Sequence, residues 1–207
     1  MQFAAGHQRG MRLQSPMGKL EKIVLFVALA PALVAQTGKP PNVTSVAAAG
    51  SVAKFGYTNS YFKLSILAPS ATVKLNPLVN ASGGRARLVQ VLSDGKSWDE
   101  TYTFAVLADA LENYHPPLES TTIYVRSIRH NLEKEGLSTV KEEFPVTIAG
   151  IQFTGAILQE QTPEGRKYFR GMYSTFLNGY ALSFDVEGAS QAKLTEMLAH
   201  MVVFPKH

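Results

Sequence analysis

The chain contains no cysteine in its 207 residues. This absence excludes disulfide bonds, thiolate nucleophiles, thiolate metal ligands and a lipid-modified amino-terminal cysteine. A folded domain of this protein must therefore depend on its hydrophobic core alone. The hydrophobic fraction of 45% and the charged fraction of 17% are typical of a globular chain that has such a core.

The chain also has little excess of positive charge outside its first residues. The whole chain has 20 basic and 16 acidic side chains, but Arg9, Arg12, Lys19 and Lys22 lie before residue 23, where only Glu21 opposes them. Residues 36–207 are left with 16 basic and 15 acidic side chains, a net charge of +1. This balance offers no basic patch to a phosphate backbone, so we expect no nucleic-acid partner.

No apolar run is long enough to cross a membrane. The segment "IVLFVALAPALVAQ" is uncharged from Ile23 to Ala35, which is shorter than the ~20 apolar residues that a bilayer requires. Basic residues before a short apolar run that ends in a small residue are typical of a secretory signal peptide. We predict this signal over residues 1–35, with cleavage near Ala35; an uncleaved membrane anchor is the alternative.

This signal predicts an exported protein, periplasmic or secreted, that meets the membrane only transiently. Met17 gives a more ordinary signal length than Met1, so residues 1–16 are interpreted as an upstream mis-start. The next segment, "QTGKPPNVTSVAAAG", is rich in Pro, Gly, Ser and Ala and has no periodicity. It predicts a flexible linker over residues 36–55, followed by one domain over residues 56–207.

Alternating apolar residues predict strands in the first half of the domain. The segments "NSYFKLSILAP", "RARLVQVLSDG" and "TYTFAVLADAL" each place apolar side chains on one face. Residues 120–136 change to a helical period with an apolar stripe, and Arg126, Arg129 and Glu133 fall on the opposite, polar side. Ser120 or Thr121 can cap the start of this helix, and Gly136 suits its end. The stripe consists of Tyr124, Val125, Ile128 and Leu132.

The second half continues with strands in close succession. The segments "FPVTIAG", "IQFTGAILQEQ", "KYFRGMYSTFL" and "YALSFDV" alternate, and Asn178-Gly179 between the last two predicts a type I′ hairpin. Ser190 can cap a final helix, and "VVF" predicts a short closing strand. Leu194, Met197, Leu198 and Met201 form the core-facing stripe of that helix. The order predicts an α+β fold, a single antiparallel sheet sandwiched between helices.

The ends of the domain resemble those of the PsbP-like family. "YTNSYFKLSILAP" resembles the opening strand, "FPVTIAGIQFTGA" the middle hairpin, and "GYALSFDVEGASQAKLTEMLAHMVVF" the closing strand, helix and strand. The resemblance runs from Gly56 to Phe204, with a departure at "APSATVKLNP", where the family often has a Gly-Trp pair. It implies an antiparallel sheet between helices, as in the Mog-type Ran-binding import factor. It implies protein binding and no shared catalytic residues.

The sequence contains no familiar catalytic or nucleotide-binding motif. It has no G-x-S-x-G, P-loop, G-x-G-x-x-G or H-E-x-x-H pattern. We interpret His130 as solvated and His200 as a core-edge residue, while His115 has only Glu112 near it in sequence, fewer ligands than a metal site needs. We therefore predict no catalytic residue, no metal and no cofactor.

Three residues are the candidate partner contacts: Trp98, Tyr114 and His115. For Trp98 the alternative is a ring that folds back under a helix edge, with only its N–H in contact with water. Trp98 lies in "SDGKSWDE", a polar turn between strands, and the other two lie in the loop "ENYHPP". Aromatic residues on such loops are the usual anchors of protein interfaces. The charged segments "EKE" and "KEE", residues 133–135 and 141–143, are interpreted as a solvated face.

These observations favour an exported, non-catalytic protein-binding or assembly module whose partner is another protein of the cell envelope. The alternative is an envelope hydrolase or a metal-dependent enzyme with a dispersed site. An open sheet surface or an exposed aromatic patch favours the binding module. An acid–base pair in a closed pocket favours the enzyme.

Overall fold

The computed structural model describes residues 40–68, 74–75, 84–93, 97, 100–162 and 165–205. The chain divides after Ala35, and all of the described residues belong to its second part. The predicted signal peptide, residues 1–35, therefore lies outside the described residues. Within the described ranges, no helix is long and apolar enough to span a membrane.

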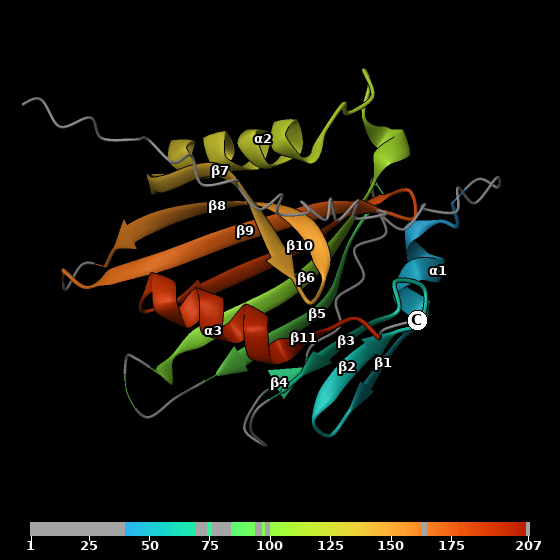
Figure 1. The fold of residues 1–207 in the computed structure, drawn as a ribbon, viewed down its shortest axis with the longest axis horizontal. Coiled ribbons are helices and arrows are strands. Elements are labelled where there is room, and N and C mark those ends of the chain that lie inside the picture. Colours follow the sequence, from blue (N-terminus) through green and yellow to red (C-terminus); the bar gives the residue numbers. More distant parts are fainter. Residues whose placement is uncertain are drawn as a thin grey trace, which may run out of the picture. The chain divides into compact units, whose positions relative to one another are not determined.

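Seven antiparallel strands form the large sheet, in the order β4-β5-β6-β10-β9-β8-β7. Each strand of the alternating sequence pattern is present, and tight turns join β7 to β8 and β9 to β10 (Figure 1). The strands are β4 (Lys74–Leu75), β5 (Arg85–Ser93), β6 (Tyr102–Ala110), β7 (Ser138–Ile148), β8 (Ile151–Gln161), β9 (Lys167–Leu177) and β10 (Tyr180–Gly188).

A second, smaller sheet corrects the prediction of a single sheet. Its antiparallel order is β1-β2-β3-β11. The closing strand pairs with β3, Val202 opposite Ile66, instead of joining the edge of the large sheet. The inner side chains of this small sheet then share one core with the large sheet. Its strands are β1 (Gly50–Ala53), β2 (Gly56–Asn59), β3 (Leu64–Leu67) and β11 (Val202–Val203).

Helices lie on both faces of the large sheet. Figure 1 shows α2 (Thr121–Lys134) on one face and α3 (Gln191–Met201) on the other. The predicted caps are present, since the side chains of Ser120 and Ser190 accept hydrogen bonds from the backbone amides of Ile123 and Lys193. A short 3₁₀-helix, η2 (Leu111–Asn113), follows β6. The fold is therefore α+β and layered, with two antiparallel sheets.

The predicted linker is wrong over its described part. Residues 43–48 form helix α1 (Val43–Ala48), whose Val43 and Val46 are buried in the core, and β1 follows it directly. The buried Asn59 side chain donates to the carbonyl of Val46 at 2.9 Å, and the Tyr180 hydroxyl donates to the carbonyl of Pro41. The helix is too short to show a periodicity, because Val43 and Val46 are its only apolar pair at helical spacing apart from alanines.

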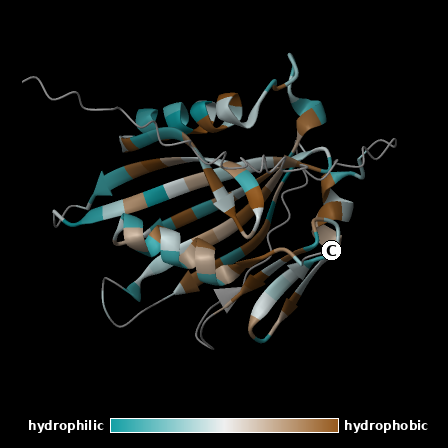
Figure 2. Cartoon of the chain, viewed as in Figure 1, coloured by the Kyte–Doolittle hydropathy of each residue, from teal (hydrophilic) through white to brown (hydrophobic). Residues whose placement is uncertain are grey.

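Two layers of apolar contacts hold the sheet and its helices together. On the α3 face, Phe104, Phe153 and Phe184 pack with the small sheet, and the rings of Phe153 and Phe184 stack at 5.1 Å. On the opposite face, Tyr124 and Val125 of α2 lie on small side chains of the sheet. Figure 2 shows the rest of α2 as largely hydrophilic, as an amphipathic helix on a sheet should be.

The hairpin between β9 and β10 has the predicted turn. Asn178 and Gly179 both have positive φ, +54° and +84°. Type I′ turns require this at both central positions. The residues of β10 that alternate toward the core, Tyr180, Leu182 and Phe184, are fully buried, so the hairpin is scaffold.

Replacing Gly179 by Val should lower the stability. A Cβ atom at this position would lie 2.9 Å from Cβ of Pro40, and a β-branched residue at φ +84° is strained. We expect a loss of about 1–3 kcal/mol in the free energy of unfolding, measured from the urea midpoint. Ala149→Gly is the control, because Ala149 already sits at φ +46° and glycine would relieve it. An unchanged midpoint for Gly179→Val would contradict the turn assignment.

Candidate functional site

The three candidate contacts from the sequence have different outcomes. Trp98 lies outside the described residues, so its role stays a prediction. His115 is exposed in the loop after β6. Tyr114 is half-buried, and its ring packs edge to face on Tyr124 at 6.0 Å. The role of Tyr114 as a partner contact also stays a prediction. Its contact with Tyr124 shows that it helps to hold α2 in place as well.

A buried carboxylate, Asp109, gathers the polar groups around Tyr114. The Tyr124 hydroxyl donates to it at 2.5 Å and the Tyr114 hydroxyl at 3.3 Å, while Arg85 Nε donates at 2.6 Å. Burial and the negative charge of Asp109 raise the pKa of Tyr124 well above its usual value, so this phenol stays protonated as a donor. The cluster ties α2 and β5 to the end of β6.

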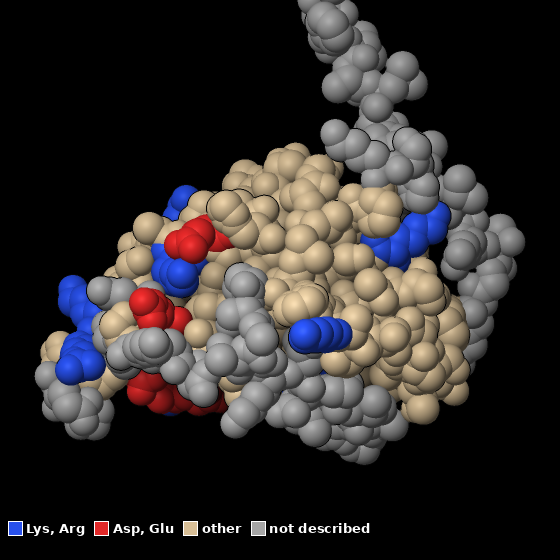
Figure 3. Space-filling model, turned by 90° about the horizontal axis from the view of Figure 1, so that it is seen from below, with Lys and Arg blue, Asp and Glu red and all other residues tan. Residues whose placement is uncertain are grey.

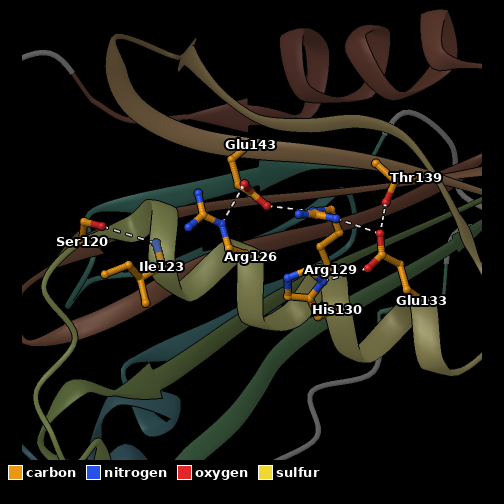
Figure 4. A network of polar contacts seen from close by, with 8 residues as sticks. All are labelled: Ser120, Ile123, Arg126, Arg129, His130, Glu133, Thr139 and Glu143. Atoms are coloured by element: carbon orange, nitrogen blue, oxygen red, sulfur yellow. Dashed lines mark hydrogen bonds and ion pairs between the residues drawn. The ribbon is translucent and has the colours of Figure 1, made fainter.

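A second polar network ties α2 to β7 (Figure 4). Arg129 was predicted on the polar side of the helix, but it is buried, with its Nε donating to Glu143 at 2.8 Å and a terminal nitrogen to Glu133 at 2.7 Å. Arg126 donates to the other oxygen of Glu143 at 3.2 Å. The prediction that "KEE" is a solvated face is thus wrong for Glu143, whose side chain is 6% exposed. A buried cation requires a charged partner, and Arg129 has one in Glu143 of β7.

This network should make stability depend on acid pH. A hydrogen bond from Thr139, with others from His130 and Arg129, lowers the pKa of Glu133 to about 2. Burial works against ionisation of Glu143, yet hydrogen bonds from Arg129 and Arg126 outweigh it and lower its pKa. Both folded-state values lie below the unfolded value of about 4.3. Their stabilisation is therefore complete only above about pH 5 and is lost as the pH falls toward 2.

Glu143→Gln should reduce that acid loss. At pH 7 we expect the variant to lose about 1–3 kcal/mol of unfolding free energy, because Arg129 is left partly unpaired. Urea unfolding at pH 7, 4 and 3 should then show a smaller further loss than in the unchanged protein. Glu196→Gln is the matched control, since Glu196 pairs with Lys193 at the surface of α3. Equal acid losses in Glu143→Gln and the unchanged protein would contradict this account.

Histidines and carboxylates do not converge in the described part of the chain. There, no group of three or more His, Asp or Glu side chains is placed to hold a metal ion. His130 is exposed, and its Nδ1 lies 2.8 Å from Glu133. His200 was expected at the core edge and is exposed on α3.

The small sheet carries several exposed apolar side chains. Among the large apolar side chains that the described residues leave exposed, four belong to this sheet or its first turn. Phe55, in the turn between β1 and β2, is 55% exposed, and the ammonium of Lys54 lies 5.1 Å from its ring centre. The four residues are Val52, Phe55, Leu67 and Val203. Leu67 and Val203 lie on the face of the sheet opposite to the core-facing Ile66 and Val202, whereas Val52 is paired with the core-facing Tyr57. We therefore call only Val52 and Phe55, which border the β1 edge, the hairpin surface.

Among the described strands, β1 pairs with β2 alone, so its other edge is open in this part of the chain. The amide of Ser60 donates to the carbonyl of Ala49, which makes this a hydrogen-bonded pair of the antiparallel ladder. Such pairs alternate, so Gly50 and Val52 direct their N–H and C=O groups away from β2. Ser51, Val52 and Ala53 are all exposed. This edge could accept one more strand.

The edge at β7 is protected by contrast. It contains Pro145 and two register shifts in its pairing with β8, and it has the charged residues Lys141, Glu142 and Glu143. Proline, bulges and charges are the usual means of preventing an edge from pairing with another chain. The "GSVA" sequence of β1 has none of them, and its pairing with β2 is regular.

A groove of about 410 Å³ lies between α3 and strands β7–β9. Its floor is formed by Ile157 and Tyr173, and Lys141 stands at its side with its ammonium 3.7 Å from the ring centre of Phe144. Among the described residues that line it there is no carboxylate and no histidine. The walls are Phe144, Val146 and Ile148 of β7 and Thr195, Leu198 and Ala199 of α3.

Two glycines in the sheet shape the floor of this groove. Gly155 lies directly opposite Tyr173 on the neighbouring strand, and Gly171 lies two residues before it. A Cβ atom at Gly155 or Gly171 would come within 2.8 Å or 2.6 Å of the Tyr173 ring. The ring can therefore lie flat against the sheet, and the Phe144 ring meets it edge to face at 6.3 Å. Sequence reasoning missed this site, although glycines inside strands often mark such a close approach.

Comparisons with known proteins give structural neighbours alone. No protein-family model matches the chain, and no curated protein matches it. A crystal structure from Bacteroides thetaiotaomicron VPI-5482 aligns with TM-score 0.38 and 16% identity over 75% of this chain, which spans half (50%) of that protein. The solution structure of cyanobacterial PsbP (CyanoP) from Synechocystis sp. PCC 6803 aligns with TM-score 0.45 and 14% identity, over 82% of this chain and 99% of that one.

The PsbP family expected from the sequence is thus represented among the similar structures. What this chain has in common with the expected fold is antiparallel sheet with few helices. At these levels of similarity, neither structure contributes a function, a partner or a functional residue to this chain.

Proposed function

We propose that this protein is an exported, non-catalytic binding module that takes an extended segment of a partner protein onto the open edge of β1. The observation that carries the proposal is the contrast between two edge strands of the described sheets, β7 of the large sheet and β1 of the small one. One is protected by Pro145, bulges and charges, and the other is uncharged and exposed. Addition of a strand to such an edge is a common mode of peptide recognition.

The backbone alone would bind weakly. Gly50 and Val52 offer two N–H and two C=O groups, and each hydrogen bond contributes about 0.5–1.5 kcal/mol net. Micromolar affinity requires about 8 kcal/mol. Contacts with the hairpin surface must supply the difference, and Val52 and Phe55 lie next to the edge with 43% and 55% of their surface exposed.

Charge favours an acidic partner. Residues 50–67 include Lys54 and Lys63 and no acidic residue. Figure 3 shows the lower face of the molecule, where acidic side chains gather at the left. The right-hand part, which holds the hairpin β1–β2 in Figure 1, displays no acidic side chain among its described atoms. We propose a partner of the cell envelope whose extended segment has apolar residues and a carboxylate near Lys54.

An enzyme is the weaker candidate. The groove near α3 has Lys141 and Tyr173 but no carboxylate or histidine among its described lining residues. Burial raises the pKa of Tyr173 to about 12, so this phenol is no base at neutral pH. The described lining of the groove therefore does not support an acid–base mechanism.

Val52→Pro tests the proposal. Proline removes the N–H that β1 directs outward, and edge strands tolerate proline at such positions. Tagged full-length protein should be expressed in its native cells and its envelope partners recovered and quantified. We expect Val52→Pro to retain the partner at least about tenfold less, a loss of ~1.4 kcal/mol, with a nearly unchanged thermal midpoint.

Val52→Thr is the matched control, because threonine keeps the N–H and the branched shape, and it should retain the partner. Phe55→Ser should weaken retention without touching the backbone. If folded Val52→Pro retains its partners as well as Val52→Thr does, the β1 edge is not the binding site.

A further inference from the structure

We propose that the groove between α3 and β7–β9 is a second site, which binds a small amphipathic carboxylate. The apolar body of the ligand lies on Tyr173 and against Phe144 and Leu198, and its carboxylate meets Lys141. This inference is independent of the β1 edge, since the two sites share no residue.

The groove is built from buried side chains. Ile148, Ile157, Tyr173 and Leu198 are 3%, 7%, 3% and 6% exposed, yet all four line the open volume. About 410 Å³ of space accommodates on the order of ten non-hydrogen atoms, if each takes the ~30 Å³ of a liquid water molecule. This volume lies within the usual range of small-molecule pockets, about 300–1,000 Å³.

Its floor has an unused polar group. Tyr173 is buried, but its hydroxyl makes no hydrogen bond with any described residue. The hydroxyl oxygen is not fully buried, because the described structure contains no fully buried side-chain oxygen or nitrogen without a partner, and Tyr173 lines the groove. A buried donor that opens into an apolar cavity usually meets a ligand or water there. Protonated at neutral pH, it can donate to an oxygen of the ligand.

The cation at the groove is placed there by a β-bulge. Lys141 pairs with Ile157, whereas Phe144 pairs with Gly155, so β7 has one extra residue between them. Without this extra residue, positions 141 and 143 would face the same side of the sheet. With it, Glu143 contacts α2 and Lys141 lines the groove. The Lys141 ammonium makes no ion pair with a described residue, and it lies over the Phe144 ring.

These features select the ligand class. A neutral apolar ligand would leave the ammonium of Lys141 without a counter-charge. A phosphate would be expected to meet several cations or a bidentate arginine, and Lys141 is the single cation among the described lining residues. One carboxylate on an apolar chain or ring satisfies Lys141 and the apolar walls together.

Decanoate and decanol are the probes, because both have about the size of the groove and they differ mainly in the carboxylate. Calorimetric titration of the full-length chain should give at least tenfold tighter binding of decanoate. Lys141→Met, which keeps the length of the side chain, should remove this difference and leave decanol binding unchanged. Ala199→Phe, on the wall of α3, should fill the groove and weaken both probes.

Lys193→Met is the control. Lys193 is a cation of α3, the helix that forms one wall of the groove, but it pairs with Glu196 and does not line the groove. This variant should bind both probes as the unchanged protein does. Equal affinity for the two probes would overturn the proposal, as would an undiminished affinity of Lys141→Met for decanoate. Lys141→Met alters a surface side chain, so this comparison remains decisive even if Ala199→Phe does not fold.

Discussion

Burial of β10 on both faces is the constraint on which the other elements depend. Along all nine residues β10 pairs with β6 on one side and β9 on the other. Tyr180, Leu182 and Phe184 face the small sheet and α3, and each such side chain contributes about 1.5–3 kcal/mol when fully buried. The chain has no disulfide bond, so this central strand and its two neighbours must supply the stability that covalent cross-links would otherwise provide.

The opposite face of β10 determines where α2 lies. Ala181 and Ser183 are small, as are Ser174 on β9 and Ala156 on β8, and the hydroxyls of the two serines form a hydrogen bond at 2.7 Å. Small residues allow the helix to approach the sheet closely, and the Tyr124–Asp109 bond fixes its position along it. The helix then brings Arg129 to Glu143. Because Glu143 faces α2, the next residue, Phe144, faces the groove on the other side of the sheet. The two sides of the sheet are therefore coupled through β7.

The features that were predicted correctly from the sequence are those that local interactions determine. Alternation identified the strands, Asn178-Gly179 the hairpin, and Ser120 and Ser190 the helix caps, because each depends on residues a few positions apart. The single sheet, the flexible linker and the placement of Arg129 on the polar side of its helix were wrong because each depends on distant partners. The pairing of Val202 with Ile66 spans most of the domain, and α1 is ordered by Asn59 and Tyr180. The groove could not be predicted either, because the bulge that turns Lys141 toward it is visible only in the register with β8.

The residues around the groove are not the ones that stability alone would favour. Glycine inside a strand costs roughly 0.5–1 kcal/mol relative to alanine, and this sheet has Gly155 and Gly171 beside one tyrosine. An open volume forfeits the dispersion contacts that a larger side chain at Thr195 or Ala199 would make. Local choices that oppose stability without a compensating contact tend to lie at functional sites. The ring of Tyr173 recovers part of the glycine cost by packing on the sheet and on Phe144, but nothing in the described structure occupies the space above it. A ligand bound in the proposed site would supply the dispersion contacts that this open volume forfeits.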